Sequence, residues 1–244
     1  MRNTTQEQDN FDLVLATSNI RQLQLAQLFP GIEQQRVEIG AIDPDTKHPN
    51  QVDMLYVVAI ARHLRAKFIF EFGTYLGRTT YHLAASEEVE KVYTLDLDPA
   101  SDPIDIPKLG AAVTAVLERG LQGVFFRGTQ YESRIQQLHG DSRLYDYSSF
   151  EKCMDLIFID AGHTYEMVLN DTQKALPMLR PGGVLIWHDF APKSPGVVNF
   201  AKEMSKMQSL FWILDTSLLL MVDGMDSMRF TPIVPEYARS RLKP

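Results

Sequence analysis

Carboxylates and imidazoles follow directly on two short apolar runs in the second half of the sequence. Asp160 comes after the first run and is followed by His163, and His188 and Asp189 come after the second. If the two runs are neighbouring parallel strands, about 5 Å apart, these four side chains meet at one edge of a sheet. Carboxylates and an imidazole together can bind a divalent cation, and a histidine in such a place can act as a general base.

Two kinds of chemistry are therefore open for this group. The predicted metal ligands are Asp160, His188 and Asp189; magnesium prefers oxygen ligands, so the imidazole also suits manganese, iron or zinc. In the alternative no metal binds, and His163 or His188 is the general base. The candidate catalytic residues are Asp160, His163 and His188. Structural roles are open as well, because His163 could cap a helix beginning near Thr164 and His188 could pair with Asp189.

A turn with two glycines follows an earlier apolar run. The run Phe68–Phe72 ends at Gly73, and Gly77 follows four residues later, just before a predicted helix start near Arg78. Glycines allow a tight turn and a close approach of the backbone to a ligand. The N–H groups at a helix start can bind a carboxylate or a phosphate. A plain turn between a strand and a helix has the same pattern.

Asp96 ends the next apolar run and lies 96 − 73 = 23 residues beyond Gly73. This is close to the ~20-residue offset at which an acidic side chain accepts hydrogen bonds from ribose hydroxyls. The turn lacks the G-x-G-x-x-G spacing that admits a pyrophosphate, and the chain has no G-x-x-x-x-G-K-[ST] phosphate loop. A ligand with adenosine and a carboxylate but no phosphates fits better, and S-adenosylmethionine is such a molecule.

The elements that carry these residues alternate along the chain. Apolar runs of strand length occupy 68–72, 91–95, 124–126, 156–159 and 184–187, and apolar positions at helical spacing mark 52–65, 109–117, 165–179 and 197–204. Such alternation predicts a parallel sheet with right-handed crossovers. Two last runs, at 211–214 and 218–222, are too close for a helical crossover and predict an antiparallel hairpin. The expected fold is α/β, Rossmann-like and doubly wound: a mostly parallel seven-stranded sheet with a C-terminal antiparallel hairpin and helices on both faces.

Length and charge limit the domain organisation and the partners. The 244 residues predict a single domain over 51–244, preceded by a polar extension over 1–50 with one helix around 20–28. The net charge of −7 disfavours nucleic acid or an anionic membrane as the main partner. The first ten residues lack the apolar core of a signal peptide, which favours a cytoplasmic protein. The sequence leaves homo-oligomer formation open.

Four segments, in order, resemble the class I S-adenosylmethionine-dependent methyltransferases. The run 70–80 resembles their motif I, Asp96 falls on their ribose-binding acid, and 158–166 and 179–189 resemble the small-molecule O-methyltransferase and cephalosporin-hydroxylase-like branch. The similarity covers roughly 68–190, about half of the chain. It implies methyl transfer from S-adenosylmethionine to a hydroxyl of a small molecule. In the metal-dependent members three strand-end residues bind magnesium, and His188 stands where these usually carry a carboxylate.

The resemblance also assigns residues to the cofactor. Glu71 would position its amino end, Gly73 and its neighbours would face the methionine part, and Gln130 would lie against the adenine. The implied cofactor-binding residues are Glu71, Gly73, Thr74, Tyr75, Gly77, Thr79, Asp96, Gln130 and Asp160. Two other classes stay open: a nicotinamide-dependent oxidoreductase, which the G-x-x-x-G turn serves poorly, and a non-catalytic binding module, for which the strand-end carboxylates and histidines would have no use.

Overall fold

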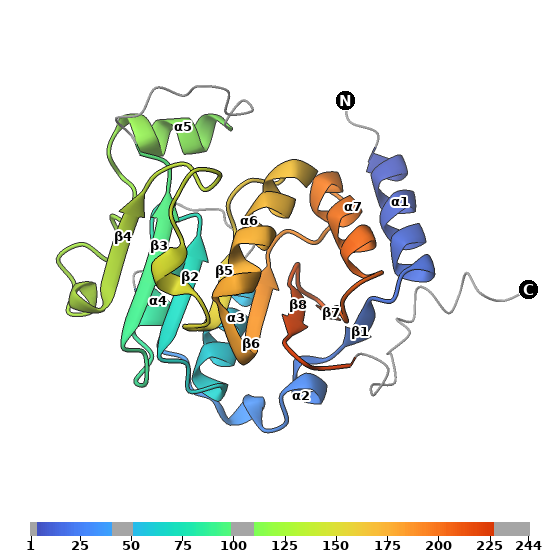
Figure 1. Ribbon diagram of the computed structural model, residues 1–244, viewed down its shortest axis with the longest axis horizontal. Helices are drawn as coiled ribbons and strands as arrows, with labels where there is room; N and C mark the ends of the chain where they lie inside the picture. The colour runs from blue at the N-terminus through green and yellow to red at the C-terminus, as the bar shows by residue number, and fades with distance from the viewer. Residues whose placement is uncertain (1–3, 41–50, 99–109, 227–244) are drawn as a thin grey trace, which may run out of the picture.

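The computed structural model describes residues 4–40, 51–98 and 110–226, which form one sheet with helices on both faces (Figure 1). The strands are β1 Arg21–Leu23, β2 Phe68–Phe72, β3 Lys91–Asp96, β4 Ile135–His139, β5 Met154–Ile159, β6 Leu179–Trp187, β7 Phe211–Ile213 and β8 Leu219–Val222. The helices are α1 Thr4–Thr17, α2 Leu25–Leu28, α3 Gln51–His63, α4 Arg78–Ala84, α5 Ala111–Glu118, α6 Tyr165–Met178 and α7 Pro195–Met204, with short 3-10 helices at Ile32–Gln34, Glu132–Arg134 and Ser148–Phe150.

The strand order is β4-β3-β2-β5-β6-β8-β7-β1, and β8 alone runs antiparallel to its neighbours β6 and β7. The predicted doubly wound, mostly parallel sheet with a terminal antiparallel hairpin is confirmed. The sheet has eight strands among the described residues, one more than predicted. Chain order reverses between β2 and β5, which pair in parallel at the centre of the sheet. In folds of this type ligands bind beyond the carboxyl ends of the strands at this reversal.

The eighth strand comes from the N-terminal segment. The helix predicted around 20–28 is wrong in its first half, because 21–23 form β1, which pairs in parallel with β7. The backbone N–H of Leu214 donates to the carbonyl of Leu23 at 2.9 Å, and the Leu23 side chain is fully buried. A boundary near residue 50 stays a prediction, since 41–50 lie outside the described residues.

The prediction of a strand at 124–126 is also wrong. The strand that pairs with β3 at this edge of the sheet is β4. Residues 124–126 form a turn held by the Gly77 loop, since Phe125 N donates to Leu76 O at 3.0 Å. β4 is an edge strand, and only Ile135 and Leu138 are buried in it. A polar edge strand of this kind carries no continuous apolar run, which is why the sequence pattern missed it.

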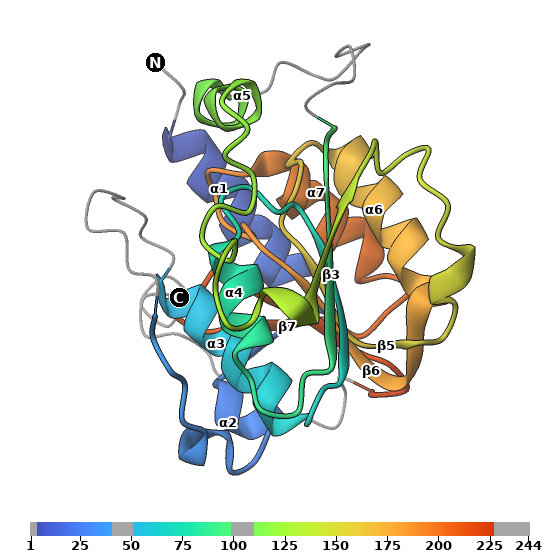
Figure 2. The same ribbon diagram turned by 90° about the vertical axis from the view of Figure 1, so that its left-hand side faces the viewer.

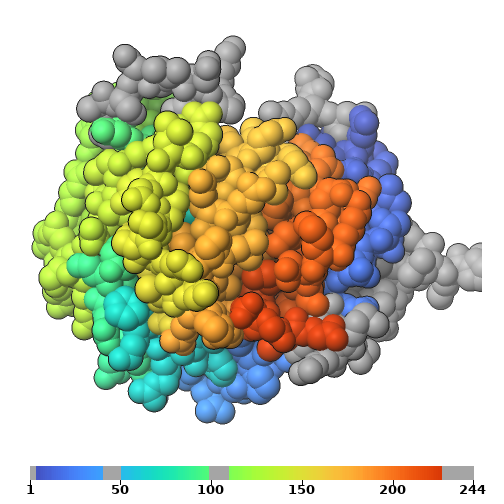
Figure 3. Space-filling model, viewed as in Figure 1, coloured from blue at the N-terminus to red at the C-terminus, as the bar shows by residue number. Residues whose placement is uncertain are grey.

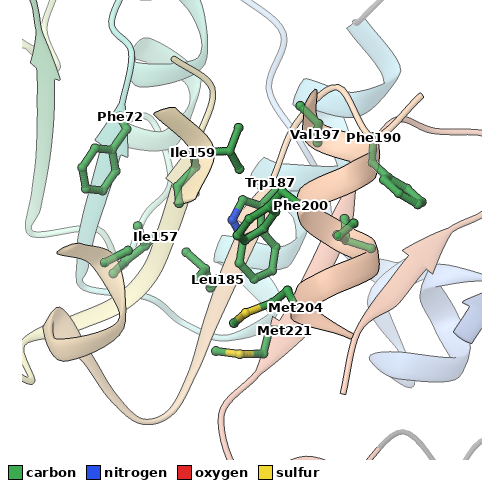
Figure 4. Packing of buried hydrophobic residues seen from close by; sticks show 14 of the residues in the cluster. Phe72, Ile157, Ile159, Leu185, Trp187, Phe190, Val197, Phe200, Met204 and Met221 are labelled. Carbon is green, nitrogen blue, oxygen red and sulfur yellow. The ribbon is translucent and has the colours of Figure 1, made fainter. Parts of the chain in front are cut away.

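Two hydrophobic cores, one on each face, hold the layers together. α1, α6 and α7 cover one face, and α2, α3 and α4 cover the other; Figure 2 shows α3 and α4 on one side of β3 and α6 on the other. In the first core the ring of Trp187 lies 5.7 Å from that of Phe200 of α7 (Figure 4). All six residues of β5 are buried, as expected for a central parallel strand covered on both sides. Among the described residues, no helix is both long and apolar enough to cross a bilayer.

Candidate active site

A cleft of about 1480 Å³ opens beyond the carboxyl ends of the central strands. Gly73 after β2, Asp96 at the end of β3, Gly140 after β4 and Asp160 after β5 all line it. α5 also lines this cleft, and Figure 1 shows α5 above the upper ends of β3 and β4. The cleft therefore lies at the reversal of strand order, where the topology predicts a ligand site.

Gly73 is the residue at which the β2 loop comes closest to the neighbouring strand end. Its φ is +96°, and a Cβ built on it would lie 2.2 Å from the backbone oxygen of Asp160. The Gly73 N–H also donates to Leu95 O at 2.8 Å, so the turn is tied to β3. Any other residue would be strained in its backbone and would push the two strand ends apart. The glycine predicted to face the cofactor thus also sets the shape of the cleft floor.

The carboxylate of Asp96 is held by two backbone N–H groups. Oδ2 accepts from Tyr75 N and Oδ1 accepts from Leu97 N, both at 2.8 Å. Asp96 is partly exposed and lines the cleft, and so does Tyr75. Each carboxylate oxygen can accept a second hydrogen bond, so a ribose diol could still bind to this fixed group.

Glu71 lies beneath the cleft floor and does not line it. The side chain is 2% exposed, and Oε2 accepts hydrogen bonds from the hydroxyls of Thr80 and Thr94, the second at 2.7 Å. Thr94 in turn shares a hydrogen bond with Thr74 at 2.7 Å. Burial raises the pKa of Glu71 to about 8, although the two threonine hydroxyls act in the opposite direction. The carboxyl group is therefore mostly protonated at neutral pH.

Replacing Glu71 with glutamine should flatten the pH dependence of stability. The pKa of Glu71 lies above its ordinary value, so between about pH 4.5 and 8 the folded protein keeps a proton that the unfolded chain releases. Stability then falls by up to about 1.4 kcal/mol per pH unit through this window. In urea denaturation, the free energy of unfolding of E71Q relative to that of wild type should rise by roughly 2 kcal/mol from pH 6 to pH 8. E90Q, at an exposed glutamate before β3, is the control; parallel curves for E71Q and wild type would contradict the assignment.

The predicted cofactor residues divide into two groups in the structure. Four of them line the cleft, namely Gly73, Tyr75, Asp96 and Asp160, and five do not, namely Glu71, Thr74, Gly77, Thr79 and Gln130. Gly77 packs against Phe126, where a Cβ would lie 2.6 Å from the ring. The strand expected to precede Gln130 does not exist. Gln130 lies in a turn before the amino end of β4, at the opposite end of that strand from the cleft. Its predicted contact with adenine is thus corrected.

The loop after β4 takes the place that had been predicted for Gln130. Gly140, Asp141, Ser142 and Arg143 line the cleft. The Arg143 guanidinium lies 2.6 Å from the Asp141 carboxylate and lowers the pKa of Asp141, and Ser142 Oγ donates to Asp171 at 2.6 Å. Sequence reasoning missed this loop because it placed the strand too early. The available signal was a glycine followed by small polar residues after Leu138-His139.

His188 does not line the cleft and lies among three carboxylates, of which Asp53 and Asp189 are buried and Asp160 is partly exposed. Its Nδ1 lies 2.9 Å from Asp160 Oδ1, and its Nε2 lies 3.2 Å from Asp53 Oδ2 of α3. Burial by itself would lower the pKa of His188, but the charge of Asp160 and the hydrogen bonds to Asp160, Asp189 and Asp53 outweigh it and raise the pKa to about 12. Ser217 N and Oγ also donate to Asp53 Oδ2, so the far carboxylate is held from two sides. His188 is a buried imidazolium that fixes Asp160 at the cleft edge.

Among the described residues, His163 is the histidine that lines the cleft. Its Nε2 lies 2.8 Å from Asp189 Oδ2, and half of its side chain is exposed. Asp189 is itself held in the left-handed backbone region (φ 58°) and pairs with Lys193 through its other oxygen at 3.0 Å. The hydrogen bond to Asp189 raises the pKa of His163, against a smaller opposing effect of burial. The pair has the arrangement of a histidine oriented by a carboxylate, with the other ring nitrogen left to exchange a proton.

The predicted metal ligands are paired with other charged groups in this structure. Both nitrogens of His188 are engaged with carboxylates, Nδ1 with Asp160 and Nε2 with Asp53. Asp160, His163 and Asp189 do place one possible ligand atom each within 4.8 Å of one another. These carboxylates are already paired with His188, His163 and Lys193, so a cation there would have to displace existing partners. The assignment of Asp160, His188 and Asp189 as metal ligands therefore stays a prediction, and a cation bound by them would have to replace the hydrogen bonds of His188.

Comparison with known proteins agrees with the topology. A family model described as a methyltransferase domain matches residues 70–190. The O-methyltransferase TomG from Streptomyces achromogenes, involved in tomaymycin synthesis and solved in complex with SAM, has a TM-score of 0.54 at 14% identity, covering 81% of this chain and 96% of that one. A Staphylococcus aureus protein provisionally named a caffeoyl-CoA O-methyltransferase has a TM-score of 0.52 at 14% identity, covering 90% and 100%.

At these identities the structural likeness shows a shared fold, and no curated protein matches the sequence. The family match spans β2 to the end of β6 and contains Gly73, Asp96, Asp160, His163 and Asp189. The chain belongs to the methyltransferase-domain family.

Proposed function

We propose that this protein transfers the methyl group of S-adenosylmethionine to a hydroxyl of a small molecule. The observation that carries the proposal is the fixed carboxylate of Asp96 in a cleft that also contains the Gly73 turn and the His163–Asp189 pair. Membership of the methyltransferase family supports it, and so does the shared fold with TomG, which was solved with S-adenosylmethionine. The nicotinamide alternative has no support from the family match.

Different residues of the cleft would contact the ribose, the adenine and the methionine part of S-adenosylmethionine. Asp96 would accept the ribose hydroxyls, and the apolar side chains of Val116 and Leu117 in α5 would lie beside the adenine together with the loop after β4. The backbone at Gly73 would face the methionine part. Bound in this way, S-adenosylmethionine supplies an electrophilic methyl group, and the protein's task is to hold the acceptor oxygen in line with it.

We assign the deprotonation of the acceptor to His163. Asp189 holds Nε2 of the ring, so Nδ1 is the nitrogen that would take the hydroxyl proton. Removal of a proton by a positioned base typically contributes ~10²–10⁴-fold. Asp160, fixed by His188 and facing the same cleft, would act on the acceptor or the cofactor amino group as a hydrogen-bond acceptor.

Isothermal titration tests the cofactor assignment. Wild type should bind S-adenosylhomocysteine and not NAD, and D96A should weaken S-adenosylhomocysteine binding at least tenfold, because two hydroxyls lose a charged acceptor. E90A is the matched control, since Glu90 is an exposed carboxylate at the other end of β3. Tight NAD binding, or an unchanged dissociation constant for D96A, would contradict the proposal.

The metal question has its own measurement. Because the donors around His188 are already paired, dialysis against a chelator should leave methyl transfer within twofold of the untreated enzyme. Activity that disappears on chelation and returns with one divalent cation would instead place that cation at Asp160, His163 and Asp189.

A further inference from the structure

The cleft continues past the ends of β5 and β6 to a wall built by α1 and the start of α7. Gln6, Glu7 and Asn10 of α1 line it, and Asn199 of α7 lines it beside them. α1 (blue) lies against α7 (orange) at the surface (Figure 3). We refer to the four side chains Gln6, Glu7, Asn10 and Asn199 as the polar wall.

The polar wall is fixed in place by the core beneath it. Phe11 of α1 is buried, and its ring lies 5.1 Å from that of Phe190 and 5.5 Å from that of Trp212. Val14, one turn further along α1, is also buried. Because Phe11 and Val14 anchor one face of the helix, the orientation of α1 is fixed and the polar residues of its first turns face the cleft.

The two sides of the cleft differ in chemistry. The side of β3 and α5 carries the apolar residues Leu95, Val113, Val116 and Leu117, which suit the adenine ring. The opposite side carries the amides and the carboxylate of the polar wall. Among the described residues that line the cleft, only Phe72, Tyr75 and Tyr165 are aromatic. Phe72 and Tyr75 flank Gly73, where the cofactor would bind, so of these three rings a flat aromatic acceptor would be left with that of Tyr165, two residues after His163.

The charges on this side disfavour an anionic acceptor. Glu7 and Glu166 bring negative charge to it. The lysine and arginine among the described lining residues are Lys193 and Arg143, and each is paired with an aspartate, Lys193 with Asp189 at 3.0 Å and Arg143 with Asp141 at 2.6 Å. Among the described residues of the polar wall side, a phosphate or carboxylate group on the acceptor would face like charges, and the lysine and arginine of the cleft are already paired.

We infer that the acceptor is an uncharged polyhydroxylated molecule of the sugar class, held by the polar wall with one hydroxyl at His163. Side-chain amides both donate and accept hydrogen bonds, as sugar hydroxyls require, and a carboxylate accepts from two of them. The inference rests on the proposed function. In the reaction the hydroxyl proton passes to His163, the oxygen forms a bond to the methyl carbon, and the carbon–sulfur bond breaks to leave the neutral thioether S-adenosylhomocysteine.

A panel of acceptors tests the substrate class. Alkyl glycosides, catechol and glucose 6-phosphate are each incubated with the enzyme and S-adenosylmethionine, and the O-methyl product is followed by mass together with S-adenosylhomocysteine. At least one alkyl glycoside should show a kcat/KM ten or more times that for catechol and for glucose 6-phosphate. A preference for catechol or for the phosphate overturns the inference, and so does the absence of any glycoside product.

Variants of the polar wall test its part in recognition. N10A and Q6A should each raise KM for the glycoside about tenfold, with the dissociation constant for S-adenosylhomocysteine unchanged. D9A is the control, because Asp9 is exposed on the same helix and does not line the cleft. An unchanged KM in both variants overturns the inference. If wild type does not bind S-adenosylhomocysteine at all, the proposed function itself is refuted, so the two failures are distinguishable.

Discussion

Replacing His163 by alanine is expected to lower kcat by ~10²–10⁴-fold while leaving the dissociation constant of S-adenosylhomocysteine within about twofold. His163 is exposed to the cleft, and Asp189 orients its ring through Nε2 at 2.8 Å, so its loss removes the proton acceptor without opening the core. Single-turnover measurement of methyl transfer would separate this chemical effect from binding. H139A is the control, since His139 is exposed at the end of β4.

The pH profile gives a second readout of the same residue. The hydrogen bond to Asp189 raises the pKa of His163 above its ordinary value of 6.5, and a proton on the free ring nitrogen blocks the base. kcat should therefore rise with pH through an apparent pKa above 6.5. D189N should shift this limb to lower pH, because the imidazolium loses its negative partner. A kcat in H163A equal to that of wild type would remove His163 from the mechanism.

The sequence pattern located the site to the extent that each strand end is preceded by a continuous apolar run. Buried parallel strands must be apolar on both faces, so Gly73, Asp96, Asp160 and Asp189 could be placed beyond strand ends without coordinates. β4 lies at the sheet edge and needs no such run. The sequence pattern therefore placed this strand at 124–126, and it placed the cofactor-facing loop at Gln130 instead of at Asp141.

Side-chain direction could not be read from the sequence. Gly73 and Glu71 are two residues apart in one motif, yet Gly73 lines the cleft and Glu71 lies beneath it on the hydroxyls of Thr80 and Thr94. His188 meets Asp53, which is 135 residues earlier in the chain. Neither periodicity nor local motif spacing contains such long-range contacts. The same holds for α1, whose Phe11 packs on Trp212 of β7.

The buried charges around His188 lead to the largest expected change in stability. H188L replaces the imidazole with an apolar side chain of similar size. The Asp53 carboxylate, which is 8% exposed, then lacks its cation. Removing one partner of a buried ion pair typically costs ~3–5 kcal/mol, because the remaining charge is neither solvated nor paired. Urea denaturation at pH 6 should show a loss of this size for H188L. H139L, at an exposed histidine, should lose less than about 0.5 kcal/mol.

The dependence of that loss on pH identifies its cause. In wild type the pKa of His188 is raised to about 12, so its contribution is complete below pH 6.5 and declines as pH rises above it. In H188L the unpaired Asp53 has a raised pKa, so acid protonates it and relieves the variant. The stability difference should be greatest near pH 6 and smaller at pH 4.5 and pH 9.

The double variant D53N/H188L should recover most of the loss at pH 6, since no buried charge then lacks a partner, while Asp160 remains a third exposed and hydrated. A loss independent of pH and not relieved by D53N would mean that His188 stabilises the fold by packing alone.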